Sequence, residues 1–186
     1  MTGYAICASH CTHKAALSVL KRIVAMGEDV VPIISERALA TDTRFGRGED
    51  LKRQAEEICG RDAVTQIRDA ELFGAHKPLD FLVVSPCTGN TLAKLASGIS
   101  DSVVTLAAKA HLRCDRPLLI SLSTNDALSQ NLQNIAAMLL RKSVYFAPMH
   151  QDAPRDKPHS LVMVEDDTFD AYFAMKRGEQ LRPLFR

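Results

Sequence analysis

The sequence has almost no net charge, because 23 lysine and arginine residues are balanced by 22 aspartate and glutamate residues, leaving +1 at pH 7. Proteins that bind nucleic acids usually concentrate positive charge on one domain or face, so this balance argues against such a partner. No apolar run approaches the roughly 20 residues that a membrane-spanning helix needs. The amino terminus also has no cationic segment followed by a long apolar stretch. We therefore expect a cytoplasmic protein without a membrane segment.

Several chemical signatures are also missing. The five cysteines are odd in number and irregularly spaced, which argues against a disulfide framework. Cys7 and Cys11 lie four residues apart, but no second pair completes a zinc site. The G-x-G-x-x-G motif of dinucleotide-binding folds and the G-x-S-x-G motif of hydrolases are both absent, and no two histidines have the helical spacing of metal ligands. We predict no metal site.

Apolar segments instead alternate between strand-like and helix-like patterns. We expect strands at residues 3–8, 30–34, 81–85, 117–122 and 144–147, and helices at 13–26, 49–59, 90–97, 101–113, 126–141 and 166–177. Asp101 is the expected N-cap of the fourth helix. Residues 35–48 read as a long loop, and a short strand at 63–67 and a helical turn at 69–73 are left open.

This alternation predicts an α/β fold with three layers, in which helices cover both faces of a doubly wound parallel sheet of Rossmann or flavodoxin type. We expect one domain over residues 1–186, with a loop or lid at 148–160 and a C-terminal helix. In such folds ligands bind beyond the carboxyl ends of the strands, so the loops that follow the strands are the candidate site.

The first two of these loops offer hydroxyl groups. Ser9 and Thr12 follow the first strand and Ser35 follows the second, where free backbone N–H groups at a helix start favour a phosphate. An ordinary helix N-cap explains the first loop equally well. His10 is the best candidate for proton transfer among the six histidines, and Arg44 could clamp a carboxylate, although a solvated surface arginine is the commoner case.

The next two loops add amide groups and further hydroxyls. The third contains Pro86, Cys87, Thr88, Asn90 and Thr91, which is more polar than a helix cap requires. The fourth contains Ser123 and Asn125, and the amide of Asn125 could read the edge of a heterocycle, whereas a cap by Thr124 or Asp126 is the simpler reading.

The third loop carries a family resemblance. Pro86, Asn90, Gly98 and Asp101 match the P-x-x-x-N-x-x-x-x-x-x-x-G-x-x-D signature of flavin-dependent cysteine decarboxylases and their relatives. The resemblance implies a flavodoxin-like fold, a homo-oligomer that is a trimer or a multiple of trimers, and FMN bound between subunits. It implies that Ser9 and Ser35 hold the FMN phosphate and that Asn90 and residues 87–91 lie near the ring.

Further segments resemble the B subunits of dipicolinate synthase, nearly end to end and in order. They are residues 3–6 with 9–12, 41–46, 107–113, 123–126 and 145–148. The resemblance implies a partner A subunit that binds NAD(P), and oxidation of a dihydrodipicolinate-type intermediate to dipicolinate (pyridine-2,6-dicarboxylate) during sporulation. It implies that Arg44, Lys109 and Arg113 meet the substrate carboxylates and that His10 or His111 moves the proton.

Two departures keep alternatives open. The decarboxylases carry methionine-asparagine after the fourth strand, where this chain has Ser123-Thr124-Asn125, and no cysteine follows Cys114 to match the cysteine of their late flap. A stand-alone flavin-dependent decarboxylase is therefore one alternative. A non-catalytic scaffold for the A subunit is the other.

Overall fold

The computed structural model describes residues 1–74 and 76–186 and contains a five-stranded, all-parallel sheet. The strands are β1 (Thr2–Ile6), β2 (Val30–Ile34), β3 (Phe81–Cys87), β4 (Leu118–Leu122) and β5 (Val144–Phe146). Their order in the sheet is β2-β1-β3-β4-β5, which is the flavodoxin-like order. The predicted fold class is confirmed.

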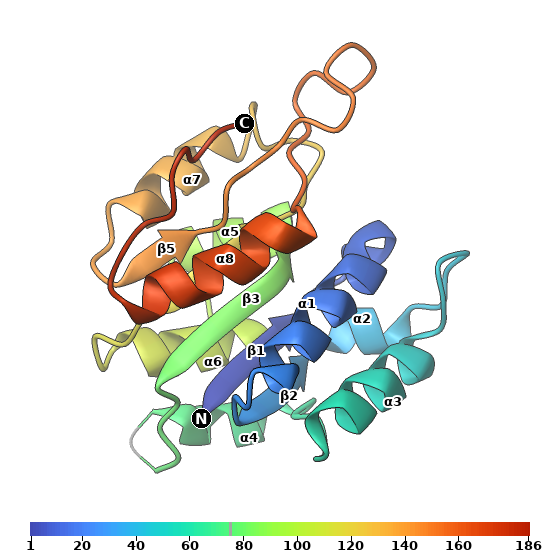
Figure 1. Cartoon of the computed structure of the whole chain (residues 1–186), viewed down its shortest axis with the longest axis vertical. Coiled ribbons are helices and arrows are strands. Elements are labelled where there is room, and N and C mark those ends of the chain that lie inside the picture. Colours follow the sequence, from blue (N-terminus) through green and yellow to red (C-terminus); the bar gives the residue numbers. More distant parts are fainter. Residues whose placement is uncertain (75) are drawn as a thin grey trace.

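Helices cover both faces of the sheet (Figure 1). One layer holds α4 (Ile67–Ala70), α5 (Gly89–Ala96), α6 (Val103–Leu112) and α7 (Leu132–Leu139), with the short 3-10 helix η2 (Glu71–Phe73). The other holds α1 (His13–Ala25), α2 (Glu36–Ala40), α3 (Gly48–Cys59) and α8 (Glu165–Lys176). The 3-10 helix η1 (His10–Thr12) leads into α1.

The core consists of two apolar clusters, one on each side of the sheet. Successive residues of β1 alternate between them, so that Tyr4 and Ile6 face one cluster while Ala5 faces the other. Every residue of β1, β2 and β4 is buried, as expected for parallel strands covered on both faces. The apolar strand segments of the sequence therefore specify the centre of the fold.

Two predicted elements were wrong in extent, and a third that the sequence left open is not formed as a strand. Residues 35–48 are not one loop, because the hydroxyl of Ser35 accepts a hydrogen bond from the Ala38 amide at 3.2 Å and caps α2. The helix expected from Asp126 begins only at Leu132, after turns in which the Asn131 amide bonds to the Asp126 carbonyl. The strand that the sequence left undecided at residues 63–67 is reduced to an isolated bridge between Val64 and Ile33.

The predicted cap of α6 was wrong by one residue. Ser102 is the N-cap, and its hydroxyl accepts from the Thr105 amide while the Thr105 side chain bonds back to the Ser102 amide. Asp101 instead forms an ion pair with Lys94 at 2.8 Å. The reciprocal bonds satisfy two helix donors, which a single exposed carboxylate would not do.

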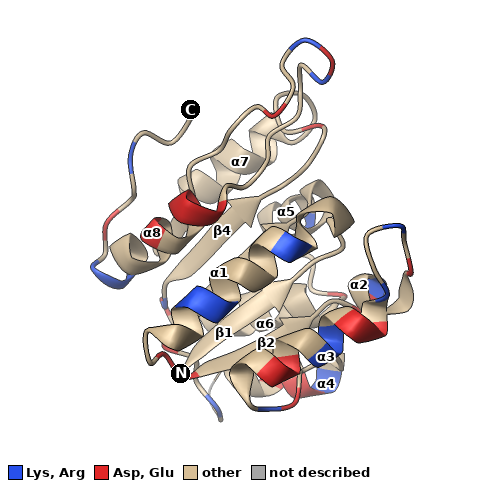
Figure 2. Cartoon of the chain, turned by 45° about the vertical axis from the view of Figure 1, so that its right-hand side comes forward, with Lys and Arg blue, Asp and Glu red and all other residues tan. Residues whose placement is uncertain are grey.

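The segment after β5 forms a loop that projects from the body of the molecule. Its two sides meet in an isolated bridge of His150 with Val162, and a second bridge joins Leu161 to Thr124 in the loop after β4. Between them, residues 151–159 are mostly exposed and carry charges of both signs (Figure 2). We call residues 150–162 the projecting loop. No helix among the described residues has the length and apolar character needed to cross a membrane.

Candidate functional site

The loops at the carboxyl ends of β1, β3 and β4 are tied together by backbone hydrogen bonds. The Cys7 amide donates to the Pro86 carbonyl at 3.2 Å, and the Ser123 amide donates to the Cys87 carbonyl at 2.8 Å. Strand order reverses between β1 and β3, which is where doubly wound folds open a crevice. The backbone therefore fixes the relative positions of the polar side chains that follow these strands.

A cavity of about 280 Å³ lies over these loops, and we call it the crevice. It is lined by the three loops and by one side of the projecting loop, through Ala8, Ser9, Cys11, Thr12, Thr88, Gly89, Asn90, Ser123, Thr124, Asn125, Asp152, Lys157, Ser160, Leu161 and Val162. Most of these residues offer a hydroxyl, an amide or a charge, so the crevice suits a polar ligand.

The first wall of the crevice comes from Ser9 and Thr12, just before α1. The Thr12 hydroxyl donates to the Ser9 carbonyl at 2.9 Å and lies 3.1 Å from the Ser9 hydroxyl. The start of α5 at Gly89 forms part of the opposite wall. Helix starts carry free N–H groups and the positive end of the helix dipole, so this part of the crevice favours an anion.

Hydroxyl groups continue beneath the crevice toward Cys7. The Thr88 hydroxyl, which caps α5, donates to the Thr91 hydroxyl at 3.0 Å, and Thr91 donates to the Cys7 sulfur at 3.4 Å. Burial raises the pKa of the Cys7 thiol to about 11, and burial also raises the pKa of Cys87. Both thiols are therefore protonated near neutral pH, and neither is suited to act as a nucleophile.

Gly89 permits a close approach between α5 and the loop after β4. A Cβ atom at this position would lie 2.5 Å from both the Asn131 amide nitrogen and the Thr124 hydroxyl. Thr124 in turn donates to the Asp126 carboxylate at 2.5 Å. Gly89 and Thr124 line the crevice and contact Asp126 and Asn131 behind it, and the motifs used to predict the site did not identify these contacts.

The projecting loop supplies the cation that lines the crevice, Lys157, which pairs with Asp152 at 2.9 Å. The Ser160 hydroxyl lies 3.4 Å from the Asn125 side-chain oxygen and joins this loop to the fourth strand loop. Sequence reasoning identified residues 148–160 as a possible lid but did not single out Lys157. The sequence feature that could have identified Lys157 is the opposite charge of Asp152, five residues earlier, in a loop otherwise rich in proline and aspartate.

The predicted cofactor residues fall into two groups. Ser9, Thr88, Asn90, Ser123 and Asn125 line the crevice together. The others lie behind it: Pro86, Cys87 and Thr91 are buried beneath the wall, and Ser35 is occupied in capping α2. His10 belongs to the lining segment, but its ring stacks edge-on against His13, with 5.0 Å between ring centroids, and does not line the crevice.

The structure does not bring the remaining predicted residues to the crevice. Arg44 lies on the exposed turn before α3, with its guanidinium over the Phe45 ring at 4.8 Å. Lys109 and Arg113 line a separate pocket along α6. His111 is fully buried on α6, where it bonds to the Pro117 carbonyl at 2.8 Å and burial lowers its pKa. A histidine held in this way serves packing within its own chain.

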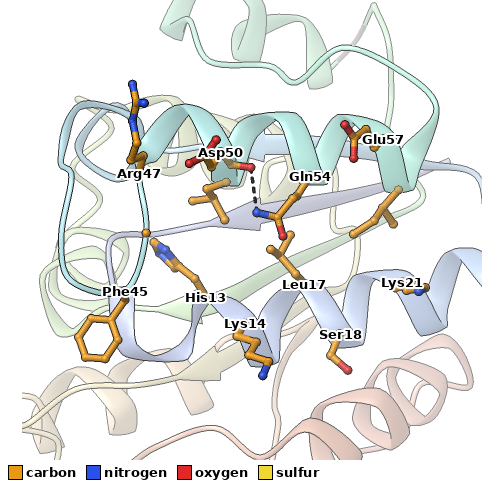
Figure 3. A pocket seen from close by; sticks show the side chains of 13 residues that line it. His13, Lys14, Leu17, Ser18, Lys21, Phe45, Arg47, Asp50, Gln54 and Glu57 are labelled. Carbon is orange, nitrogen blue, oxygen red and sulfur yellow. Dashed lines mark hydrogen bonds between the residues drawn. The ribbon is translucent and has the colours of Figure 1, made fainter.

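A larger groove of about 600 Å³ runs between α1 and α3 (Figure 3). Its floor includes Leu17, Leu51 and Ile58, and its rims carry lysines from α1 and acidic residues from α3. The groove lies along two helices rather than over the carboxyl ends of the strands. The smaller crevice is the stronger candidate site, because it collects polar groups from three strand loops and the projecting loop.

Comparisons with known proteins place the chain among flavin-related proteins. The model of the family described as Flavoprotein matches residues 9–173. The B subunit of dipicolinate synthase from Bacillus subtilis (strain 168) is 36% identical over 182 residues, which cover 98% of this chain and 91% of that protein. The chain is therefore a homologue of the dipicolinate synthase B subunits.

Solved structures share the fold. The crystal structure of the dipicolinate synthase B subunit from Bacillus halodurans C matches with a TM-score of 0.90 and 36% identity, covering 100% of this chain and 95% of that one. A dodecameric FMN-dependent UbiX-like decarboxylase from Escherichia coli O157:H7 matches with a TM-score of 0.68 and 20% identity, covering 100% and 98%. The second likeness shows the shared fold alone.

Proposed function

We propose a function for this chain from the premise that it belongs to the Flavoprotein family. We infer that it is the B subunit of a dipicolinate synthase, which works with an A subunit that binds NAD(P) and helps to oxidise a dihydrodipicolinate-type intermediate to dipicolinate during sporulation. The similarity to a dipicolinate synthase B subunit along 98% of the chain supports this proposal. The observation that carries it is the polar crevice over β1, β3 and β4.

The residues of the crevice fit one end of FMN. Ser9 and Thr12 offer hydroxyl donors beside the start of α1, and the start of α5 faces them across the crevice, which suits a phosphate. Small-molecule sites usually enclose about 300–1,000 Å³. The crevice, at about 280 Å³, would hold only part of a flavin. The rest would lie at its mouth, near Asn90 and Asn125.

Oxidation of the dihydro intermediate removes two hydrogens and produces an aromatic ring. FMN, when bound, supplies a hydride acceptor for this step. The amides of Asn90 and Asn125 would orient the ring systems, because each offers both a donor and an acceptor. Lys157 would leave its ion pair with Asp152 and neutralise one carboxylate of the substrate instead. His10, whose neighbours Ser9 and Cys11 line the crevice, is the candidate for moving the proton, and its ring would have to turn away from His13 to do so.

A ligand that extends beyond the crevice would contact another chain. The related decarboxylase of known structure is a dodecamer, which supports a homo-oligomer here, built from trimers as in the family resemblance. Arg44, Lys109 and Arg113 could reach a substrate in the crevice only from a second copy, because they do not line it in their own chain.

The absorption spectrum of the purified chain, with and without added FMN, tests the cofactor directly. Exposed Cys11 lines the crevice, so alkylation of this residue reports occupancy, while exposed Cys114 provides an internal reference away from the crevice. We expect FMN to slow alkylation of Cys11 and to leave Cys114 unchanged. Ser9→Ala should weaken FMN binding, whereas the matched Ser97→Ala variant, at the far end of α5, should not.

Activity is then measured on the two-subunit complex. We expect dipicolinate formation to require this chain and to fall in the Ser9→Ala variant. A colourless chain that leaves Cys11 unprotected, yet raises the activity of the A subunit, would replace this proposal with the scaffold. Release of CO2 from a cysteinyl or aromatic acid substrate by the chain alone would replace it with the decarboxylase.

A further inference from the structure

A third cavity, of about 330 Å³, lies among the helices on the face of the sheet opposite to the one that α1 and α8 cover. It is formed by the end of α5, one side of α6 and the residue two positions after α7, and we call it the cation pocket. Three cations line it, Lys109 and Arg113 from α6 and Arg141 from the segment after α7. Its apolar lining includes Leu95, Ile99 and Leu112, and none of its lining residues is acidic.

The three cations have no carboxylate partners within the described part of the chain. Acidic residues are nevertheless close by in sequence: Asp101 pairs with Lys94 at 2.8 Å, and Asp115 lies 3.9 Å from Lys142. Carboxylates thus engage the neighbouring lysines and leave the pocket cations available. Uncompensated positive charge around an apolar surface favours an anion with an apolar body.

Two of the cations are also held by contacts that leave their charge free. The Lys109 ammonium donates to the Ser100 hydroxyl at 3.3 Å, which positions the group without neutralising it. The Arg113 guanidinium lies so close to Gly74 that a Cβ atom there would come within 2.5 Å of Nη2. The guanidinium of Arg113 thus lies against the backbone at Gly74 and not against an acid among the described residues.

Helix electrostatics alone do not account for this arrangement. Lys109 and Arg113 lie in the last turn of α6 and at its C-cap, where cations stabilise the negative end of the helix dipole. Arg141 comes from another segment, beyond the C-cap of α7, and meets them across the pocket. The leucines between the cations have no role in the dipole effect.

We propose that the cation pocket binds a small aromatic dicarboxylate of the dipicolinate class at a site separate from the crevice. The flat ring lies against Leu95 and Leu112, and its carboxylates meet guanidinium and ammonium groups, of which guanidinium binds carboxylate in a bidentate manner. The identity of the ligand rests on the proposed function, since dipicolinate is its product. The class of the ligand rests on the pocket itself.

Calorimetric titration of the full chain with pyridine-2,6-dicarboxylate tests the site, in metal-free buffer because this compound chelates cations. Benzene-1,3-dicarboxylate keeps the two carboxylates without the ring nitrogen, and benzoate keeps one. We expect both dicarboxylates to bind and benzoate to bind about tenfold more weakly, because it loses one charge-assisted contact. Affinity should fall as salt is raised.

Variants then assign the site. Arg141→Gln and Lys109→Gln should each weaken dicarboxylate binding about tenfold, whereas Lys142→Gln, which removes the neighbouring cation outside the pocket, should leave it unchanged. All three side chains belong to exposed residues, so the variants should fold, and thermal unfolding checks this. Unchanged affinity in both pocket variants would overturn the proposal, as would no binding by the unmodified chain.

The outcome separates this site from the proposed function. If Asn90→Ala abolishes dicarboxylate binding while Arg141→Gln does not, the ligand occupies the crevice and the cation pocket is not its site. If the two-subunit complex makes no dipicolinate but the pocket variants still weaken dicarboxylate binding, the pocket stands and the proposed function fails. An active complex whose chain binds no dicarboxylate at the pocket would refute this inference alone.

Discussion

The crevice and the cation pocket are built from different parts of the polypeptide. The crevice is formed by short side chains on loops that backbone hydrogen bonds connect, and Lys157 is its cation. The three cations of the cation pocket are long, exposed side chains at or just beyond the ends of helices, beside an apolar lining of Leu95, Ile99 and Leu112. Short side chains on a fixed backbone can position a ligand closely. Long side chains at helix ends adapt to it and act mainly through charge.

This difference predicts that small changes of shape disrupt the crevice most strongly. In Gly89→Val the new side chain would overlap Thr124 and Asn131, so we expect about 3 kcal/mol of destabilisation from overpacking. FMN binding should be lost as well. Asn90→Ala changes the next residue of α5, whose side chain is exposed, and serves as the control. It should leave the stability of the protein nearly unchanged. Urea unfolding measures both, and equal stability of the two variants would contradict the close approach at Gly89.

Around α6, by contrast, stability should depend on the start of the helix rather than on its cations. Ser102→Ala removes the reciprocal cap with Thr105 and should cost about 1 kcal/mol. Asp101→Ala breaks only a surface pair with Lys94 and should have a smaller effect. Thermal unfolding of the two variants compares them directly, and a larger loss at Asp101 would restore the cap expected from sequence.

The buried histidine of α6 should make stability depend on pH. Burial lowers the pKa of His111 in the folded protein, whereas the unfolded chain titrates it near its usual value of about 6.5. Protons therefore bind preferentially to the unfolded state, so stability is retained above that pH and falls as pH drops below it. His13, whose pKa burial also lowers, adds to the same trend.

Urea unfolding at pH 7.5 and 5.5 measures this dependence. In His111→Gln the loss between the two pH values should be smaller than in the unmodified chain, whatever the absolute stability of the variant. His159→Gln, in the exposed projecting loop, should leave the difference unchanged. An undiminished loss in His111→Gln would assign the pH dependence to other groups.

The smallest expected effect concerns Lys157, a cation of the projecting loop that lines the crevice. Lys157→Gln should weaken FMN or substrate binding roughly threefold at low salt, and less at high salt, because an exposed charge is screened by solvent and ions. Arg155→Gln, in the same loop but outside the crevice lining, is the matched control. Equal effects of the two variants would indicate a general charge effect of the loop rather than a contact in the crevice.

The sequence determined the parallel sheet and placed the candidate site at the carboxyl ends of its strands. Unbroken apolar segments such as residues 81–85 predict strands covered on both faces, and the polar residues after them must gather at one edge. Ser9, Thr88, Asn90, Ser123 and Asn125 were identified in this way, and all of them line one crevice. These predictions depend on the local periodicity of apolar residues and on the order of the elements along the chain, both of which can be read from a single sequence.

Tertiary structure alone decided which charged groups meet. Lys109 and Arg113 share one side of α6, but Arg141, far along the chain, becomes their neighbour only when α7 packs beside α5. Lys157 reaches the crevice because the bridges at Thr124 and His150 direct the projecting loop. His111 was a plausible catalyst by sequence, yet packing buries it away from the crevice. The physical reason is that contacts between distant segments depend on how helices pack and loops close, which local patterns do not encode.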